Sequence, residues 1–240
     1  MAPPFGAGAL QSAAVDRQVR VVIAEDEILM RSGLRLVLER ADLEVVGEAG
    51  DESTLWSLTE SLRPDIVVTD IRMPPTYTDE GLRFALSIRA TQPGIAVLVL
   101  SQHVQRKYAV DLVARRAGGT GYLLKQRVAD VEEFCRAVQR VAAGGTVLDP
   151  EVVEVLLAKA RRERPAVGAL TPRQTDVLGL MAQGRSNASI ARLLAISEQA
   201  VVQQSTQLDD QLQLGAADSD DPRRALNVVR FLNGSSSNER

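Results

Sequence analysis

Residues 65–90 read DIVVTDIRMPPTYTDEGLRFALSIRA, a short β-branched run, a loop and then a stretch whose apolar residues recur at helical spacing. Four similar strand–helix units surround it between residues 20 and 143, with the strand segments RVVIA, EVVGEA, IAVLVL and GYLL. Alternating strands and helices are typical of a parallel sheet covered by helices on both faces. Because crossovers are right-handed, the units favour an α/β flavodoxin-like domain with five parallel strands in the order 2-1-3-4-5.

A small all-α domain is predicted after this first one. Asp149 and Pro150 are suited to begin a helix over 151–164, which RPAVGA at 164–169 interrupts. Thr171 and Gln174 have the spacing of a capping box and begin the first of four short helices. We therefore divide the chain into a disordered tail, the α/β domain, a linker helix with its linker, the all-α domain and a second disordered tail, at residues 1–19, 20–145, 146–169, 170–233 and 234–240.

Polar side chains follow four of the predicted strands, at the edge where parallel α/β sheets bind ligands. Glu25 and Asp26 follow the first strand and Asp70 ends the third, while Ser101 follows the fourth and Lys125 the fifth. Converging carboxylates raise one another's pKa values unless a counter-charge is present, and their oxygens suit a hard cation such as Mg²⁺. Each residue alone would be an ordinary loop residue. Together they indicate a site for phosphoryl transfer.

The segments that carry these groups resemble the receiver domain of two-component response regulators. They are VVIAEDE at 21–27, VVTDIRMPP at 67–75, VLVLS at 97–101 and GYLLK at 121–125, and the resemblance covers residues 20–145. It implies that Asp70 takes a phosphoryl group from a sensor histidine kinase and forms an acyl phosphate. It also implies a Mg²⁺ cofactor bound by Asp26, Asp70 and the Arg72 carbonyl, with Glu25 acting through a bound water.

The same resemblance gives roles to residues at the ends of the last two strands. Ser101 and Lys125 would bind the phosphoryl group, and Tyr122 resembles the aromatic residue that turns inward when the hydroxyl moves. Tyr122 can equally be ordinary strand packing. Receivers often use the fourth helix, fifth strand and fifth helix for dimers or interdomain contacts, so we expect a homodimer when the chain is phosphorylated.

Residues 170–201, LTPRQTDVLGLMAQGRSNASIARLLAISEQAV, resemble the LuxR-type helix-turn-helix of the NarL/FixJ group of response regulators, and the resemblance extends to about residue 232. The recognition helix departs from that group, because SEQAVVQQSTQLDDQLQL at 197–214 contains no Lys or Arg. Ser205 also replaces an expected apolar core residue, yet Val201 and Leu208 keep helical spacing and should preserve the fold. From residue 166 onward, eight acidic residues accompany seven arginines, so this domain lacks the excess of positive charge that is typical of DNA-binding domains.

Two functions of different class remain open. In the first, the chain is a phosphorylation-controlled, DNA-binding transcriptional regulator, in which phosphates are contacted by Arg173, Arg185 and Arg192 and bases are read by Gln199, Gln203 and Gln207. In the second, the helix-turn-helix is degenerate and binds a protein instead of DNA. Family analogy favours the first. An enzymatic output is not expected, because residues 150–240 contain no His or Cys.

The composition limits the remaining function classes. The net charge of −3 argues against general affinity for nucleic acid or for anionic membranes, so DNA contacts must be local. No apolar run approaches the length of a membrane span, and residues 1–18 lack the features of a signal peptide. The sequence therefore predicts a cytoplasmic protein with no membrane partner.

Overall fold

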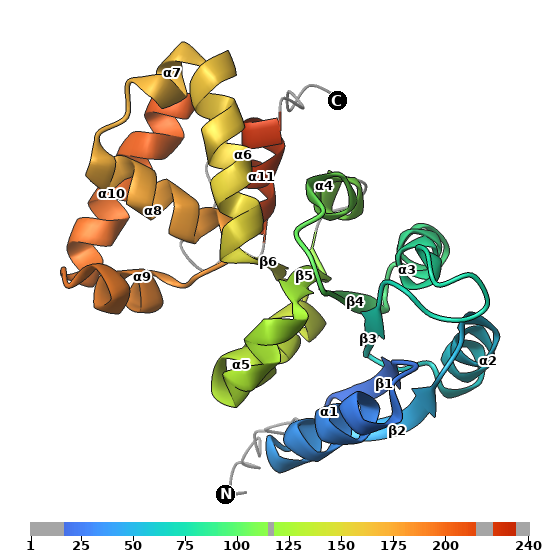
Figure 1. Cartoon of the computed structure of the whole chain (residues 1–240). Coiled ribbons are helices and arrows are strands. Elements are labelled where there is room, and N and C mark those ends of the chain that lie inside the picture. Colours follow the sequence, from blue (N-terminus) through green and yellow to red (C-terminus); the bar gives the residue numbers. More distant parts are fainter. Residues whose placement is uncertain (1–16, 115–117, 215–222, 234–240) are drawn as a thin grey trace, which may run out of the picture.

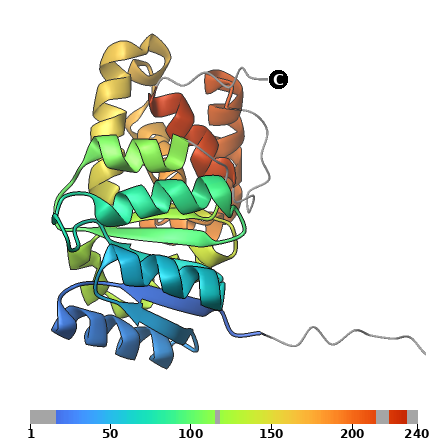
Figure 2. The ribbon, with the colours of Figure 1, turned by 90° about the vertical axis from the view of Figure 1, so that its right-hand side faces the viewer.

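The computed structural model describes residues 17–114, 118–214 and 223–233, in which a helical domain packs against one side of an α/β domain (Figures 1 and 2). The tails predicted at 1–19 and 234–240 lie outside the described residues, except for residues 17–19.

A parallel sheet of six strands forms the centre of the α/β domain, in the order β2-β1-β3-β4-β5-β6. The strands are β1 (Arg20–Ala24), β2 (Glu44–Ala49), β3 (Ile66–Asp70), β4 (Ala96–Ser101), β5 (Thr120–Leu124) and β6 (Thr146–Leu148). The first five confirm the predicted flavodoxin-like order. The additional strand β6 falls in the segment predicted as linker and pairs in parallel with β5. Its three residues are too few to give a periodic signal, although all three are buried.

Helices cover both faces of the sheet (Figure 1). One face is covered by α1 (Ile28–Arg40) and α5 (Val131–Ala142), whose apolar side chains pack on Val21, Ile23 and Val68. The other face packs, through Val22, Val67 and Val97, against α2 (Glu52–Leu62), α3 (Glu80–Thr91) and α4 (Arg106–Ala114). Strands β3 and β4 are therefore buried on both sides, which explains their continuous apolar sequence.

The C-terminal part of the chain is helical. Its helices are α6 (Pro150–Glu163), α7 (Pro165–Gly168), α8 (Pro172–Ala182), α9 (Asn187–Leu194), α10 (Glu198–Leu212) and α11 (Arg223–Asn233). The predicted capping box is present, with the Thr171 hydroxyl accepting from the Gln174 N–H and the Gln174 side chain accepting from the Thr171 N–H. Ser205 is buried on α10 and donates its hydroxyl to the Val201 carbonyl at 2.8 Å, so the polar residue is satisfied within its own helix.

Among the described residues, no helix combines the length and the apolar character that crossing a bilayer requires.

The two domains share one continuous hydrophobic core. Helix α11 packs against α6 and α8 of its own domain and also against α4 and β6 of the sheet domain. Its residues Leu226, Val229 and Leu232 are almost fully buried. The α8–α9 turn lies against the edge of the sheet, where Gly184 adopts a φ of +78° next to the Thr146 carbonyl.

This contact predicts that Gly184→Ala loosens the domain junction. A Cβ at residue 184 would lie 2.0 Å from the Thr146 carbonyl oxygen, and the positive φ adds roughly 1 kcal/mol of strain for a residue with a side chain. We expect faster amide hydrogen exchange in β6 and α11. The control is Gly33→Ala within α1, where a Cβ meets nothing within 4 Å and alanine favours the helix. Unchanged exchange in β6 of Gly184→Ala would contradict the prediction.

Candidate functional site

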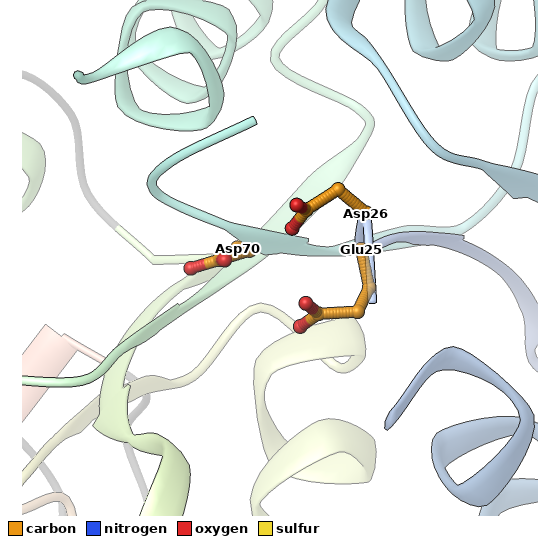
Figure 3. A group of neighbouring side chains, drawn as sticks. All are labelled: Glu25, Asp26 and Asp70. Carbon is orange, nitrogen blue, oxygen red and sulfur yellow. The ribbon is translucent and has the colours of Figure 1, made fainter. Parts of the chain in front are cut away.

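Three carboxylates meet at the carboxyl-terminal edge of the sheet. Glu25 and Asp26 directly follow β1, and Asp70 is the last residue of β3, which pairs with β1 in parallel. Ligand atoms of the three side chains lie within 4.8 Å of one another, and Figure 3 shows the side chains grouped at the strand ends. Glu25 and Asp70 are buried, whereas Asp26 is partly exposed. The parallel register therefore brings together carboxylates that are distant in the sequence.

Lys125, directly after β5, supplies the counter-charge. Its Nζ lies 2.8 Å from an Asp70 carboxylate oxygen and 2.8 Å from a Glu25 carboxylate oxygen. Burial raises the pKa of both carboxyl groups, and the Lys125 ammonium opposes that rise. Burial alone would lower the pKa of Lys125, but its bonds to Asp70 and Glu25 outweigh this and raise it. The ion pairs thus favour a charged ammonium beside the carboxylates.

The donor set fits a hard divalent cation. Carboxylate oxygens from three residues surround one small space, and oxygen is the ligand atom that Mg²⁺ prefers. Arg72, whose carbonyl is predicted as a further ligand, lines the same cleft of about 210 Å³. Space remains there for water and for a small anionic group.

Glu80 anchors the loop that follows Asp70. Its carboxylate is fully buried and accepts hydrogen bonds from the backbone N–H groups of Thr78 at 2.9 Å, Thr76 at 3.1 Å and Met73 at 3.4 Å, and from the Thr76 hydroxyl. Burial alone would raise the pKa of Glu80, but these bonds outweigh it and hold the pKa at about 2. The loop is therefore tied to the first turn of α3.

Gly81 allows α3 to begin close to Asp70. Its N–H donates to the Ile71 carbonyl at 2.9 Å, and a Cβ at this residue would lie only 1.7 Å from the Asp70 carbonyl oxygen. No other residue type fits this close approach without moving the backbone that carries Asp70.

Ser101 and Tyr122 share one acceptor. Ser101 ends β4 and donates its hydroxyl to the His103 carbonyl at 2.8 Å, and the Tyr122 hydroxyl donates to the same carbonyl at 3.1 Å. The Tyr122 oxygen also accepts from the Gln105 N–H at 3.2 Å, and its ring is fully buried. Burial raises the pKa of Tyr122. The β4–α4 loop is therefore bonded to both residues predicted to act as a switch.

The residues predicted to contact DNA fall into two groups. Arg192 on α9 and the glutamines Gln199, Gln203 and Gln207 on α10 are exposed. Arg173, in contrast, is partly buried and donates to the Leu194 carbonyl at 2.8 Å. Helix α10 packs mainly on other helices of its own domain, and in Figure 1 it lies on the side away from the sheet.

Arg185 connects the two domains. It immediately precedes the N-cap of α9, and its guanidinium forms a hydrogen-bonded ion pair with the Glu133 carboxylate of α5. Glu133 also pairs with Arg136 on its own helix at 3.3 Å. In this arrangement Arg185 is bound to the α/β domain.

Comparisons with known proteins agree with this architecture. The family described as response regulator receiver domain matches residues 21–139, and the family described as bacterial regulatory proteins, luxR family, matches residues 168–212. The transcriptional regulatory protein MctR of Rhizobium johnstonii is 34% identical over 181 residues, covering 75% of this chain and 80% of MctR. The nitrate/nitrite response regulator NarL of Escherichia coli is 35% identical over 187 residues, covering 75% of this chain and 83% of NarL.

A solved structure of the RcsB response regulator of Salmonella typhimurium is similar with a TM-score of 0.52 and 22% identity, covering 90% of this chain and all of that chain. This likeness supports the fold. The two family matches and the sequence relatives show that the chain belongs to the response regulators that join a receiver domain to a LuxR-type helix-turn-helix, as predicted.

Several residues around the site were not identified from the sequence. Glu80 and Gly81 look like an ordinary helix start after a proline-rich loop, so nothing in the sequence distinguishes them. Asp149 was predicted only as an N-cap, which it is, but its buried carboxylate also binds Arg127 at 2.9 Å and the Leu124 N–H at 3.1 Å. The partner of Arg185 could not be inferred, because Glu133 lies 52 residues away.

The Glu80 anchor predicts a pH-dependent loss of stability in Glu80→Gln. Because the pKa of about 2 in the folded protein lies below the ordinary glutamate value of 4.5, the carboxylate contributes stability above pH 4.5 that is lost as the pH falls towards 2. We expect Glu80→Gln to lower the free energy of unfolding by roughly 2 kcal/mol at neutral pH, with the deficit shrinking in acid. Urea unfolding measures this loss of free energy of unfolding, and the control is Glu60→Gln, because Glu60 is exposed on α2. An equal deficit at pH 7 and pH 3 would exclude this role.

Proposed function

We propose that Asp70 accepts a phosphoryl group from a sensor histidine kinase and that this phosphorylation controls a DNA-binding transcriptional regulator. The observation that carries the proposal is the position of Asp70 at the end of β3, with Lys125 Nζ at 2.8 Å and two further carboxylates beside it. The family membership and the relatives named as transcriptional regulators support it.

The chemistry assigned to the site is a phosphoryl transfer between side chains. A carboxylate oxygen of Asp70 attacks the phosphorus of a phosphohistidine, the P–N bond breaks as the O–P bond forms, and the kinase imidazole leaves. Lys125 is positioned to pair with a phosphoryl oxygen once Asp70 has lost its carboxylate charge in the acyl phosphate. A Mg²⁺ ion held by Asp26, Asp70 and the Arg72 carbonyl, and by Glu25 through a bound water, would neutralise charge on the transferring group.

The response to phosphorylation is assigned to Ser101 and Tyr122. When the Ser101 hydroxyl turns to a phosphoryl oxygen, it leaves the His103 carbonyl that it shares with Tyr122. The β4–α4 loop then changes its bonding, and α4 is the helix on which α11 packs. Phosphorylation would thereby alter the domain junction and expose surface for a homodimer.

Phosphorylation at Asp70 predicts that Asp70→Asn takes up no label. An amide cannot act as the nucleophile, so incubation with Mg²⁺ and a small phosphodonor should leave the variant at background, whereas the natural chain is labelled. Asp42→Asn is the control, because Asp42 lies outside the site and its φ of +58° suits Asn. Label that persists on Asp70→Asn would place the phosphorylation elsewhere.

The interdomain ion pair predicts that Glu133→Gln strengthens DNA binding. Freed from Glu133, Arg185 can neutralise a DNA phosphate, which should make the slope of log affinity against log salt steeper by about 0.9. Titration of the phosphorylated chain with genomic DNA fragments at several salt concentrations measures this slope. Glu132→Gln is the matched control, since the Glu132 side chain is 86% exposed and its carboxylate pairs at 3.8 Å with Arg136 on the same helix. Equal slopes for the two variants would show that Arg185 takes no part.

A further inference from the structure

The exposed face of α10 presents neutral side chains. Val201, Ser205, Leu208 and Leu212 are buried against the rest of the domain. The opposite side exposes Gln199, Val202, Gln203, Thr206 and Gln207, and Val202 is 46% exposed despite being apolar. This face covers the first three turns of the helix, the part that a helix-turn-helix inserts into the major groove.

The chemistry of this face excludes the commonest way of reading guanine. Guanine presents two acceptors, N7 and O6, which are read by Arg or Lys, and residues 197–214 contain neither. Glutamine can bond adenine through N6 and N7, and an apolar side chain can contact the thymine methyl group. Both kinds of group are adjacent here, in Val202 and Gln203.

Carboxylates could accept from the cytosine N4 amine, so their positions matter. Asp209 is partly buried and is attracted electrostatically to Arg224, although burial is the larger effect and raises its pKa. Asp210 is exposed but lies eight residues beyond Val202, about 12 Å further along the helix axis. Glu198 is the first residue of α10. The centre of the face is therefore left to Val202 and the glutamines.

We propose that α10 reads A·T base pairs in the major groove, with Gln203 bonding adenine and Val202 contacting a thymine methyl group. This inference rests on the proposed function and specifies its DNA ligand. Gln199, one turn before Gln203, provides a second adenine contact, and the Thr206 hydroxyl can hydrogen-bond to either base of the pair. Specificity then comes from base contacts, while the phosphate contacts that usually supply affinity are few.

The test begins with selection from random duplexes of about 30 base pairs, long enough for two half-sites one helical turn apart, by the phosphorylated full-length chain. We expect selected sites rich in A·T pairs, bound about tenfold more tightly than G·C-rich duplexes of equal length. In the selected duplex, 7-deazaadenine removes the N7 acceptor and uracil in place of thymine removes the methyl group. Each replacement should weaken binding by about threefold or more.

Three protein variants test which side chain is responsible for the effect of each base replacement. Gln203→Ala should become less sensitive to 7-deazaadenine, because only the Gln199 contact to adenine remains, and Val202→Ala should become insensitive to uracil. Gln211→Ala, exposed in the last turn of α10, should retain both sensitivities. Sites rich in G·C pairs, or binding indifferent to both replacements, would overturn the inference while leaving DNA binding intact. If no duplex is bound although Asp70 is phosphorylated, the proposed DNA-binding function fails, and the inference fails with it.

Discussion

The pairing of Lys125 with Asp70 and Glu25 is the interaction on which the site depends. Parallel pairing of β1 with β3 forces carboxylates together, and burial makes their charges costly. The ammonium at the end of β5, 2.8 Å from each of two carboxylates, compensates part of that cost. Because the cation comes from a different strand, the sheet must be assembled before the site exists, and the site in turn joins three strand ends.

A chain of contacts connects this site to the helical domain. Ser101 and Tyr122 bond the same His103 carbonyl, and the loop that carries it leads into α4. Helix α4 packs on α11, whose apolar side chains are almost fully buried in the core common to both domains. This chain of contacts is the route by which the proposed movement of the Ser101 hydroxyl would reach α11, whose side chains belong to the core that both domains share.

In the helical domain, the exposed helix α10 and the residues that contact the α/β domain lie in different places. Helix α10, which carries the neutral face, lies on the side of the helical domain away from the sheet, whereas the α8–α9 turn contacts β6 through Gly184 and α5 through Arg185. Arg173 is also occupied, by the Leu194 carbonyl. Of the three arginines predicted to contact phosphate, two are thus engaged within the protein, and only the Arg185 contact depends on how the two domains are arranged.

The sequence by itself determined the flavodoxin-like strand order, the capping box at Thr171 and the residue types of the acidic site, because these follow from local periodicity and from residues at strand ends. Only the tertiary structure decided that Thr146–Leu148 joins the sheet, that Glu80 and Gly81 support Asp70, and that Glu133 holds Arg185. A three-residue strand has no readable period, and a buried carboxylate or a glycine beneath a carbonyl is recognised only from its neighbours. Those neighbours are brought together by the folded backbone, not by adjacency in the chain.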